Sequence, residues 1–164
     1  MNAFWPSLLL SVLAQLIMVP STYLMLNPLY RHEDLSPTTY RMLLACSFAM
    51  GAGCGALYAL HPEIHTQLFV GTSVIAIAVL AIVLRRRIPY LLGSFFCAEF
   101  FIYSTSSIAR VVDICVTGRA GATYQQTWIG VAITWLLIVI VLVLYRARFQ
   151  SCLYYILDHA HNNL

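Results

Sequence analysis

Long stretches without any charged side chain dominate this sequence. Four windows contain no Asp, Glu, Lys or Arg: residues 1–30, 42–62, 64–84 and 120–145. A fifth window, residues 88–109, holds a single charged residue, Glu99. Because a helix needs about 20 apolar residues to cross the hydrocarbon core of a bilayer, each window is long enough to span a membrane. The pattern therefore predicts transmembrane helices at residues 5–27, 42–61, 66–84, 88–108 and 125–145.

The composition agrees with this interpretation. The chain has 164 residues, of which 61% are hydrophobic and 9% charged, and its mean hydropathy is +0.82. Soluble domains carry roughly 25% charged residues, so this chain has too few to cover a soluble surface or to track nucleic acid phosphates. We expect an all-α, polytopic membrane helical bundle of about five transmembrane helices that contacts the lipid bilayer and no nucleic acid.

The arginines predict the orientation of this bundle, because short cytoplasmic loops are enriched in basic residues. Seven arginines fall in the first loop, the third loop and the tail: Arg31, Arg41, Arg85, Arg86, Arg87, Arg146 and Arg148. Only Arg110 and Arg119 fall on the opposite side. The N-terminus is therefore predicted to lie outside and the C-terminus in the cytoplasm, with the protein in a cell membrane, such as a bacterial plasma membrane. Pro20 is expected to kink the first span without ending it.

Glu99 is the most informative single residue, because an ionised carboxylate in the middle of a span costs several kcal/mol unless it is paired or hydrated. Tyr103, Ser106 and Arg110 follow it at helical spacing and would form one polar stripe. This stripe predicts a ligand-binding or coupling cavity that opens outward, with Glu99 at its floor and Arg110 at its rim. The alternative is an interhelical hydrogen bond from Glu99 to Gln15 or to a hydroxyl of another span.

The second span carries small residues at every fourth position: Ser47, Gly51, Gly55 and Ala59. Such a ridge lets helix backbones approach closely, which is how helices associate inside a membrane. We expect the ridge to pack within the bundle, and homodimerisation through the same face is the alternative.

Other polar features give weaker signals. The short loop with His61, Glu63 and His65 could bind a metal or sense pH, but an ordinary solvated turn is the preferred interpretation. The five cysteines show no disulfide or zinc spacing. No nucleotide-binding or hydrolase motif is present either. We therefore predict no catalytic residue, no metal and no cofactor.

Residues 146–164 are predicted to form a cytoplasmic juxtamembrane segment after the transmembrane domain of residues 1–145. Phe149, Cys152, Leu153 and Ile156 would share one apolar face of an amphipathic helix, with Gln150 on the polar side. The helix then stops at HAHNNL without a capping pattern, which indicates the N-terminal segment of a longer protein.

The closely spaced spans, the cytoplasmic exit and the segment LYRARFQSCLYYILDHAHNNL together resemble the membrane domain of bacterial sensor histidine kinases of the GHKL type. The resemblance implies a homodimeric sensor that detects an extracellular peptide or small molecule and signals to a cytoplasmic kinase. By that logic Glu99, Tyr103 and Arg110 would form the ligand or coupling site. Two alternatives remain open: a small membrane protein that binds or transports a small molecule, and a membrane subunit of a larger complex.

Overall fold

The computed structural model describes residues 4–31, 35–83, 88–118 and 127–162, and this part of the chain consists of helices joined by short turns. Its elements are, in chain order, α1 (Phe4–Gln15), α2 (Met18–Arg31), α3 (Pro37–Leu60), the short 3₁₀ helix η1 (Pro62–Ile64), α4 (His65–Val83), α5 (Ile88–Thr117) and α6 (Trp128–Asn162). The predicted all-α class is therefore confirmed, and each predicted span coincides with a helical segment.

The first predicted span is interrupted between Gln15 and Met18. Pro20 has no backbone N–H, and its ring crowds the carbonyl four residues earlier, which is that of Leu16. That carbonyl instead accepts a hydrogen bond from the N–H of Val19, three residues later, at 3.0 Å. The prediction that Pro20 perturbs this span without ending it thus matches the structure, and the break lies one turn before the proline.

Local capping fixes the ends of α3 and α5. The Ser36 side chain accepts a hydrogen bond from the Thr39 N–H at 3.1 Å, and Pro37 fits the first turn of α3, where no N–H is needed. Gly118 ends α5 in the left-handed conformation, with φ at 65°. Its N–H donates to the Ile114 carbonyl at 2.9 Å, as expected for a glycine that closes a helix.

One predicted boundary in the C-terminal half was wrong. Residues 109–117 continue α5, where a connecting loop was expected. Arg110 was taken as the end of the span, but a charged residue is compatible with helical backbone. The division at residue 145 stays a prediction, because it separates a membrane-spanning part from a cytoplasmic part, and α6 passes through it as one helix from Trp128 to Asn162.

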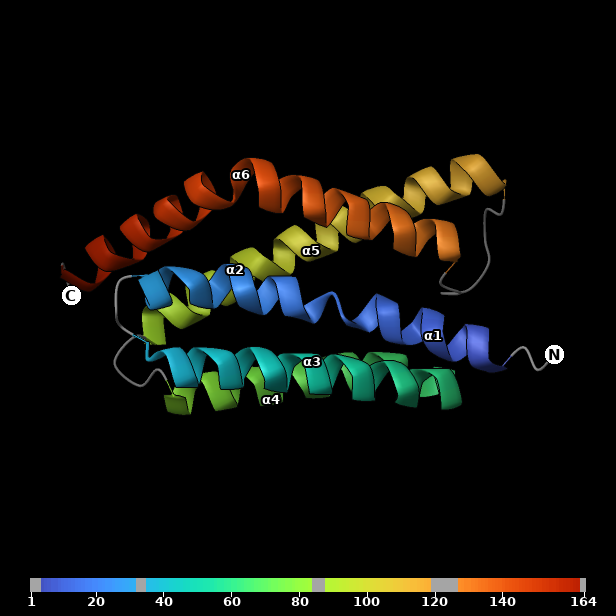
Figure 1. Cartoon of the computed structure of the whole chain (residues 1–164), viewed down its shortest axis with the longest axis horizontal. Coiled ribbons are helices and arrows are strands. Elements are labelled where there is room, and N and C mark those ends of the chain that lie inside the picture. The colour runs from blue at the N-terminus through green and yellow to red at the C-terminus, as the bar shows by residue number, and fades with distance from the viewer. Residues whose placement is uncertain (1–3, 32–34, 84–87, 119–126, 163–164) are drawn as a thin grey trace.

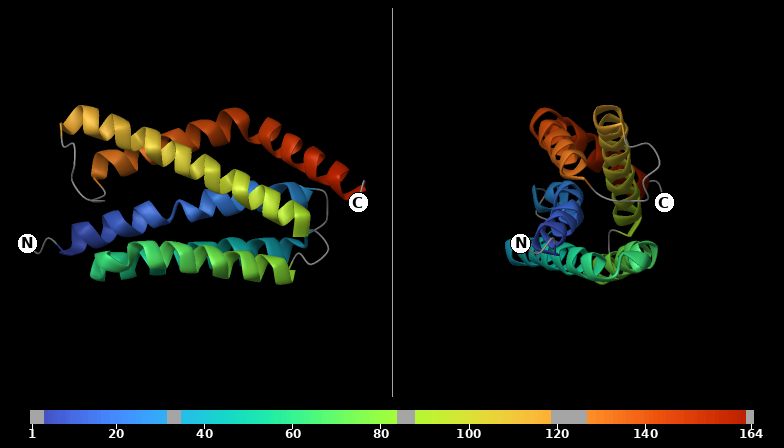
Figure 2. Two further views of the ribbon diagram at one scale, coloured as in Figure 1. Left: turned by 180° about the vertical axis from the view of Figure 1, so that it is seen from behind. Right: turned by 90° about the vertical axis from the view of Figure 1, so that its right-hand side faces the viewer.

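The helices form three layers with α1 and α2 in the middle (Figures 1 and 2). One side is covered by α3 and α4, and the other by α5 and α6. Successive segments run in alternating directions along the bundle, with α1 and α2 acting as one pass (Figure 1). The central position of α2 explains why eight of its fourteen residues are buried. It also places α2 in contact with α3, α5 and α6.

The apolar core lies near the end of α2 that carries Arg31. Leucines from α2, α3, α4 and α5 meet there with Met25 and Leu35 in one cluster: Met25, Leu26, Leu29, Leu35, Leu43, Leu80 and Leu91. At the same end, the rings of Tyr30 and Tyr40 stack with centroids 4.6 Å apart. This contact joins α2 to α3 across their short connection.

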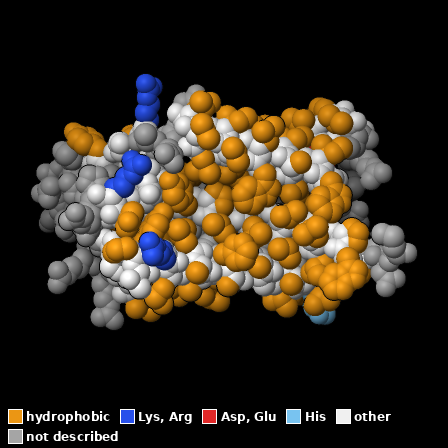
Figure 3. Space-filling model, viewed as in Figure 1, with side chains coloured by type: hydrophobic (Ala, Val, Ile, Leu, Met, Phe, Trp, Pro, Cys, Tyr) orange, Lys and Arg blue, Asp and Glu red, His pale blue; other side chains and the backbone are white. Residues whose placement is uncertain are grey.

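The outer surface is apolar over most of its length. Hydrophobic side chains cover the middle of the face shown in Figure 3, and its basic side chains lie toward one end. Within the described residues, three segments are long and apolar enough to cross a membrane: Phe4–Arg31, Pro37–Leu60 and Leu91–Val116. Val70–Val83 and Trp128–Leu144 are shorter apolar helices. A surface of this kind suits a membrane protein.

Candidate functional site

A cavity of about 100 Å³ lies between α2, α3, α4 and α5. Its wall on α4 is purely apolar, whereas α2 and α3 supply hydroxyl and sulfur groups and α5 supplies one aromatic ring and one carboxylate. The lining residues are Met18, Ser21, Thr22, Met25, Leu43, Cys46, Ser47, Met50, Ile75, Ala76, Val79, Leu80, Phe95 and Glu99. We refer to this cavity as the Glu99 pocket.

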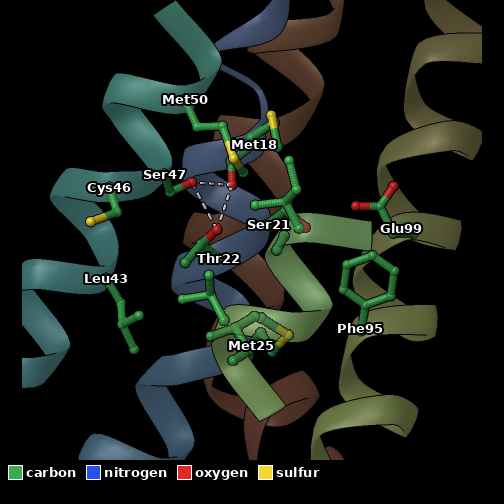
Figure 4. A pocket seen from close by; sticks show the side chains of 14 residues that line it. Met18, Ser21, Thr22, Met25, Leu43, Cys46, Ser47, Met50, Phe95 and Glu99 are labelled. Carbon is green, nitrogen blue, oxygen red and sulfur yellow. Dashed lines mark hydrogen bonds between the residues drawn. The ribbon is translucent and has the colours of Figure 1, made fainter. Parts of the chain in front are cut away.

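Glu99 extends from α5 toward α2 across this pocket, and Phe95 lies one turn before it on the same wall (Figure 4). The side chain is partly buried. Among the described residues, none donates a hydrogen bond to its carboxylate. A carboxylate in such apolar surroundings needs a proton, water or a bound partner to offset its lost hydration. The pocket therefore contains a polar group whose binding capacity the fold leaves unused.

Three polar atoms form a hydrogen-bonded triangle on the opposite wall (Figure 4). The Thr22 hydroxyl donates to the Met18 carbonyl at 2.9 Å, and the Ser47 hydroxyl donates to the same carbonyl at 3.2 Å. The two hydroxyl oxygens lie 2.8 Å apart. This triangle joins α2 to α3 just after the break in the first span. It places oxygen atoms across the pocket from Glu99.

The predicted polar stripe is only partly brought into one site. Glu99 lines the pocket, but Tyr103, Ser106 and Arg110 do not. Tyr103 is 71% exposed and Arg110 is also exposed, while Ser106 is half-buried. The reason is the path of α5, which diverges from α4 as it runs toward Thr117 (Figure 2). The face that meets α4 near Phe95 is therefore uncovered one turn beyond Glu99. Of the four stripe residues, Glu99 alone lines the Glu99 pocket, and an outward-opening cavity with Arg110 at its rim stays a prediction.

Gln15, one of the two partners that the alternative interpretation offered for Glu99, lies away from it. Gln15 is half-buried at the end of α1 and does not line the pocket. No hydrogen bond joins it to Glu99 within the described residues. Its backbone carbonyl instead lies against α3, where it is 3.0 Å from the position a Cβ would take at Gly51.

The small-residue ridge of α3 faces α1 of the same chain. Ser47, Gly51 and Gly55 are buried and Ala59 is half-buried. A Cβ at Gly55 would lie 2.5 Å from the Cα of Val12, far inside normal contact distance. The ridge is thus occupied by an intramolecular helix contact, so a second copy of the chain would have to use another face.

Two long-range hydrogen bonds connect α6 to the central layer. The Trp135 indole N–H donates to the Leu13 carbonyl at 2.9 Å. In an uninterrupted helix, Ile17 would donate to this carbonyl, so Trp135 stabilises the interruption. The Asn27 amide donates to the Gln150 side-chain oxygen at 2.7 Å, and both residues are buried.

The Asn27 contact places Gln150 on the inner face of α6. Gln150 is only 2% exposed because its amide finds a buried polar partner on α2, whereas Cys152, from the predicted apolar face, is exposed. The apolar face was expected to meet a membrane surface or a partner helix, and it stays a prediction. The side chains of Phe149, Leu153 and Ile156 lie outside the part of the chain whose side chains are described.

The turn between α3 and α4 contains one ionic contact. His61 Nδ1 lies 3.1 Å from Glu63 Oε1, and both side chains are exposed. The pKa of Glu63 is lowered by a hydrogen bond from its own backbone N–H and by the His61 side chain. The side chain of His65 is not among those described. No group of three His, Cys, Asp or Glu residues that could hold a metal occurs in the described part of the chain.

A second hollow lies on the outer side of α2. It is an apolar groove of about 660 Å³ beside the break, bounded by α2, α3 and α6 and lined by residues that include Pro20, Phe48 and Trp135. It contains no acidic or basic side chain among its described lining residues. The groove has the character of a lipid-facing surface.

Sequence reasoning identified Glu99 but missed Thr22, Met18 and Phe95. The pair Ser21–Thr22 directly after Pro20 is a signal that could have drawn attention to this level of the bundle, because polar groups often gather where a proline frees backbone carbonyls. No feature of the sequence indicated that α4 lines the pocket, because its pocket-lining residues are all apolar. Comparisons of the chain with protein-family models, with curated proteins and with solved structures found no match.

Proposed function

We propose that this protein is an integral membrane protein whose helical bundle binds a small molecule in the Glu99 pocket and acts as a sensor or input domain. The observation that carries the proposal is the Glu99 carboxylate, which faces a cavity between four helices without a hydrogen-bond donor from the described residues. Intramembrane acids without a structural partner mark ligand and ion sites in many membrane proteins.

The sensor role is supported by α2, which both lines the Glu99 pocket and contacts α6. One stretch of α2, from Met18 to Met25, lines the Glu99 pocket. Two residues further, Asn27 bonds Gln150 in the part of α6 that continues beyond its apolar segment. A ligand that shifts α2 therefore acts on α6 through a buried, directional contact. The expected topology has five crossings with the N-terminus outside, so this part of α6 would lie on the cytoplasmic side.

The output of such a sensor is expected to be a GHKL-type histidine kinase, on the resemblance described above. The same resemblance predicts a homodimer. Both expectations rest on the arrangement of the spans and on the basic segment after residue 145.

Carrier activity is the second candidate, and the interruption between α1 and α2 is the observation that favours it. Discontinuous helices often form the substrate sites of transporters, and Met18, the first residue after the break, lines the pocket. Uptake of a probe into liposomes by the purified chain would favour the carrier, whereas binding without uptake would favour the sensor.

The test of the binding site uses two matched substitutions on α4. Ala76 lines the pocket and Ala78, on the same helix, is exposed away from it. Ala76→Phe should fill most of the cavity and abolish the stabilisation of the purified chain by hexanol or hexylammonium, measured as the shift in Tm. Ala78→Phe should leave that shift intact. Equal shifts in the two variants would show that these probes bind elsewhere or partition nonspecifically into the micelle.

A further inference from the structure

The hydrogen-bonding character of the Glu99 pocket indicates which chemical class of ligand it selects. Two hydroxyl hydrogens, those of Thr22 and Ser47, serve three contacts: each hydroxyl with the Met18 carbonyl, and the two hydroxyls with each other. A hydroxyl has only one hydrogen to donate. The two hydrogens can make only two of the three contacts at a time. Both are therefore used within the triangle, and the hydroxyl oxygens offer lone pairs to the cavity.

The other polar groups of the pocket are mostly acceptors as well. An ionised carboxylate at Glu99 accepts hydrogen bonds only, and the thioether sulfurs of Met18, Met25 and Met50 are weak acceptors. Among the described residues that line the pocket, none is Arg, Lys or His. The remaining donors are the Ser21 hydroxyl and the weakly donating Cys46 thiol. An anionic or acceptor-rich ligand would find little to bind here.

The aromatic and thioether groups also suit a cation. Phe95 precedes Glu99 by one helical turn, and its ring lines the same pocket (Figure 4). An aromatic ring can bind an ammonium group over its face. Thioethers are soft and polarizable and adapt to irregular apolar ligands. A carboxylate, an aromatic ring and oxygen lone pairs thus lie around one volume.

The size and opening of the pocket restrict the ligand further. A cavity of about 150 Å³ in another protein holds one benzene molecule, so the volume of about 100 Å³ here accommodates an ammonium head and a few carbon atoms. Ile75 and Val79 on α4 line the pocket and are 56% and 42% exposed, so this wall of the pocket borders the outer surface. Any longer part of the ligand would pass between apolar side chains.

We propose that the Glu99 pocket binds an amphiphilic primary amine, with its ammonium group between Glu99 and the Thr22–Ser47 oxygens and its alkyl tail directed past Ile75 and Val79. This inference names the ligand class of the proposed binding function and therefore rests on it. The ammonium group is attracted to the Glu99 carboxylate, which receives no hydrogen bond from the described residues and can therefore form a charge-assisted hydrogen bond with the ligand.

The experiment compares three six-carbon probes on the purified full chain in micelles of a neutral detergent at pH 7: hexylammonium, hexanol and hexanoate. Hexylamine is protonated at this pH because alkyl amines have pKa values near 10. We expect hexylammonium to bind at least about tenfold more tightly than hexanol, as a charge-assisted hydrogen bond allows, and hexanoate to bind most weakly. Glu99→Gln should remove the preference for the amine and leave hexanol binding within about twofold of its original value.

The matched control is Glu63→Gln, which makes the same chemical change at an exposed carboxylate outside the pocket and should leave the amine preference unchanged. If Glu99→Gln does not fold, Phe95→Leu provides a second variant, which should weaken hexylammonium severalfold more than hexanol because only the cation uses the ring face.

Several results would overturn the inference. Equal binding of hexanol and hexylammonium, with Ala76→Phe still blocking both, would refute the amine and leave the proposed binding function standing. An amine preference that survives in Glu99→Gln would show that the carboxylate does not recognise the cation. Stabilisation by sodium or potassium chloride alone that Glu99→Gln abolishes would identify an inorganic cation site. Failure of all three probes would refute both the amine and the proposed function.

Discussion

The contact between α1 and α3 makes a quantitative prediction about three glycines on one helix. Gly51, Gly53 and Gly55 lie within five residues of each other on α3, but a Cβ added at each would meet very different surroundings. At Gly53 nothing lies within 4 Å. At Gly51 the Gln15 carbonyl oxygen would be 3.0 Å away, and at Gly55 the Val12 Cα would be 2.5 Å away.

The size of the effect follows from these distances. Carbon atoms in contact prefer a separation of about 3.5–4.0 Å, so Ala at position 55 requires α1 and α3 to separate by about 1 Å. The atoms in the way are backbone atoms, which cannot rotate aside. Overpacking of this kind costs about 1–3 kcal/mol. Replacing Gly by Ala also favours the helix by about 1 kcal/mol, but this gain is common to all three substitutions and cancels when they are compared.

We therefore expect Gly55→Ala to be less stable than Gly53→Ala by about 1–3 kcal/mol, with Gly51→Ala between them. The measurement is unfolding of the purified chain in mixed micelles with increasing dodecyl sulfate, followed by far-UV circular dichroism. Equal midpoints for Gly55→Ala and Gly53→Ala would refute the close approach of α1 to α3. A loss of stability that depends on protein concentration would instead indicate that the ridge serves a contact between copies.

Two further predictions concern the link to α6 and the turn between α3 and α4. Asn27→Leu should lower the free energy of unfolding by about 1–3 kcal/mol because it leaves the buried Gln150 oxygen without its donor. The double variant with Gln150→Leu should lose less stability than the sum of the two single variants. Additive losses in this double-mutant cycle would contradict the contact. For the turn, the pKa of Glu63 is lowered, so the pairing with His61 is present above the ordinary pKa of the carboxyl and is lost as the pH falls through the lowered value. An NMR titration should show the Glu63 midpoint below its ordinary value in the parent chain and closer to that value in His61→Ala, whereas an unchanged midpoint in that variant would rule out a role for the His61 contact.

The amino-acid sequence by itself determined the class of fold and the approximate places of the helices. Within a single segment, a run of apolar residues satisfies its backbone groups in an apolar medium by forming a helix. The described residues of each predicted span are largely helical, with a break between Gln15 and Met18 in the first. It also drew attention to Glu99, the one charge within an otherwise apolar window, which the structure places in a pocket. The perturbation by Pro20 was equally local, since a proline acts on the carbonyl four residues before it.

Helix faces and partners were decided only by the tertiary structure. All six helices are apolar over much of their circumference, so the pattern along the chain does not reveal which side faces a neighbour. Tyr103 shares a helical face with Glu99, yet the divergence of α5 from α4 leaves Tyr103 exposed and Glu99 in the pocket.

The polar contacts between helices were also decided by the tertiary structure. The sequence pattern placed Gln150 off the apolar face of the tail helix, but it did not reveal that Gln150 is buried against Asn27, a residue 123 positions away in the chain. Trp135 similarly bonds a carbonyl on α1 that lies 122 positions away. Such pairs depend on how the layers stack, and a one-dimensional pattern carries no information on that. The sequence therefore specified the helices and the exceptional carboxylate, and packing in three dimensions assembled the pocket around it.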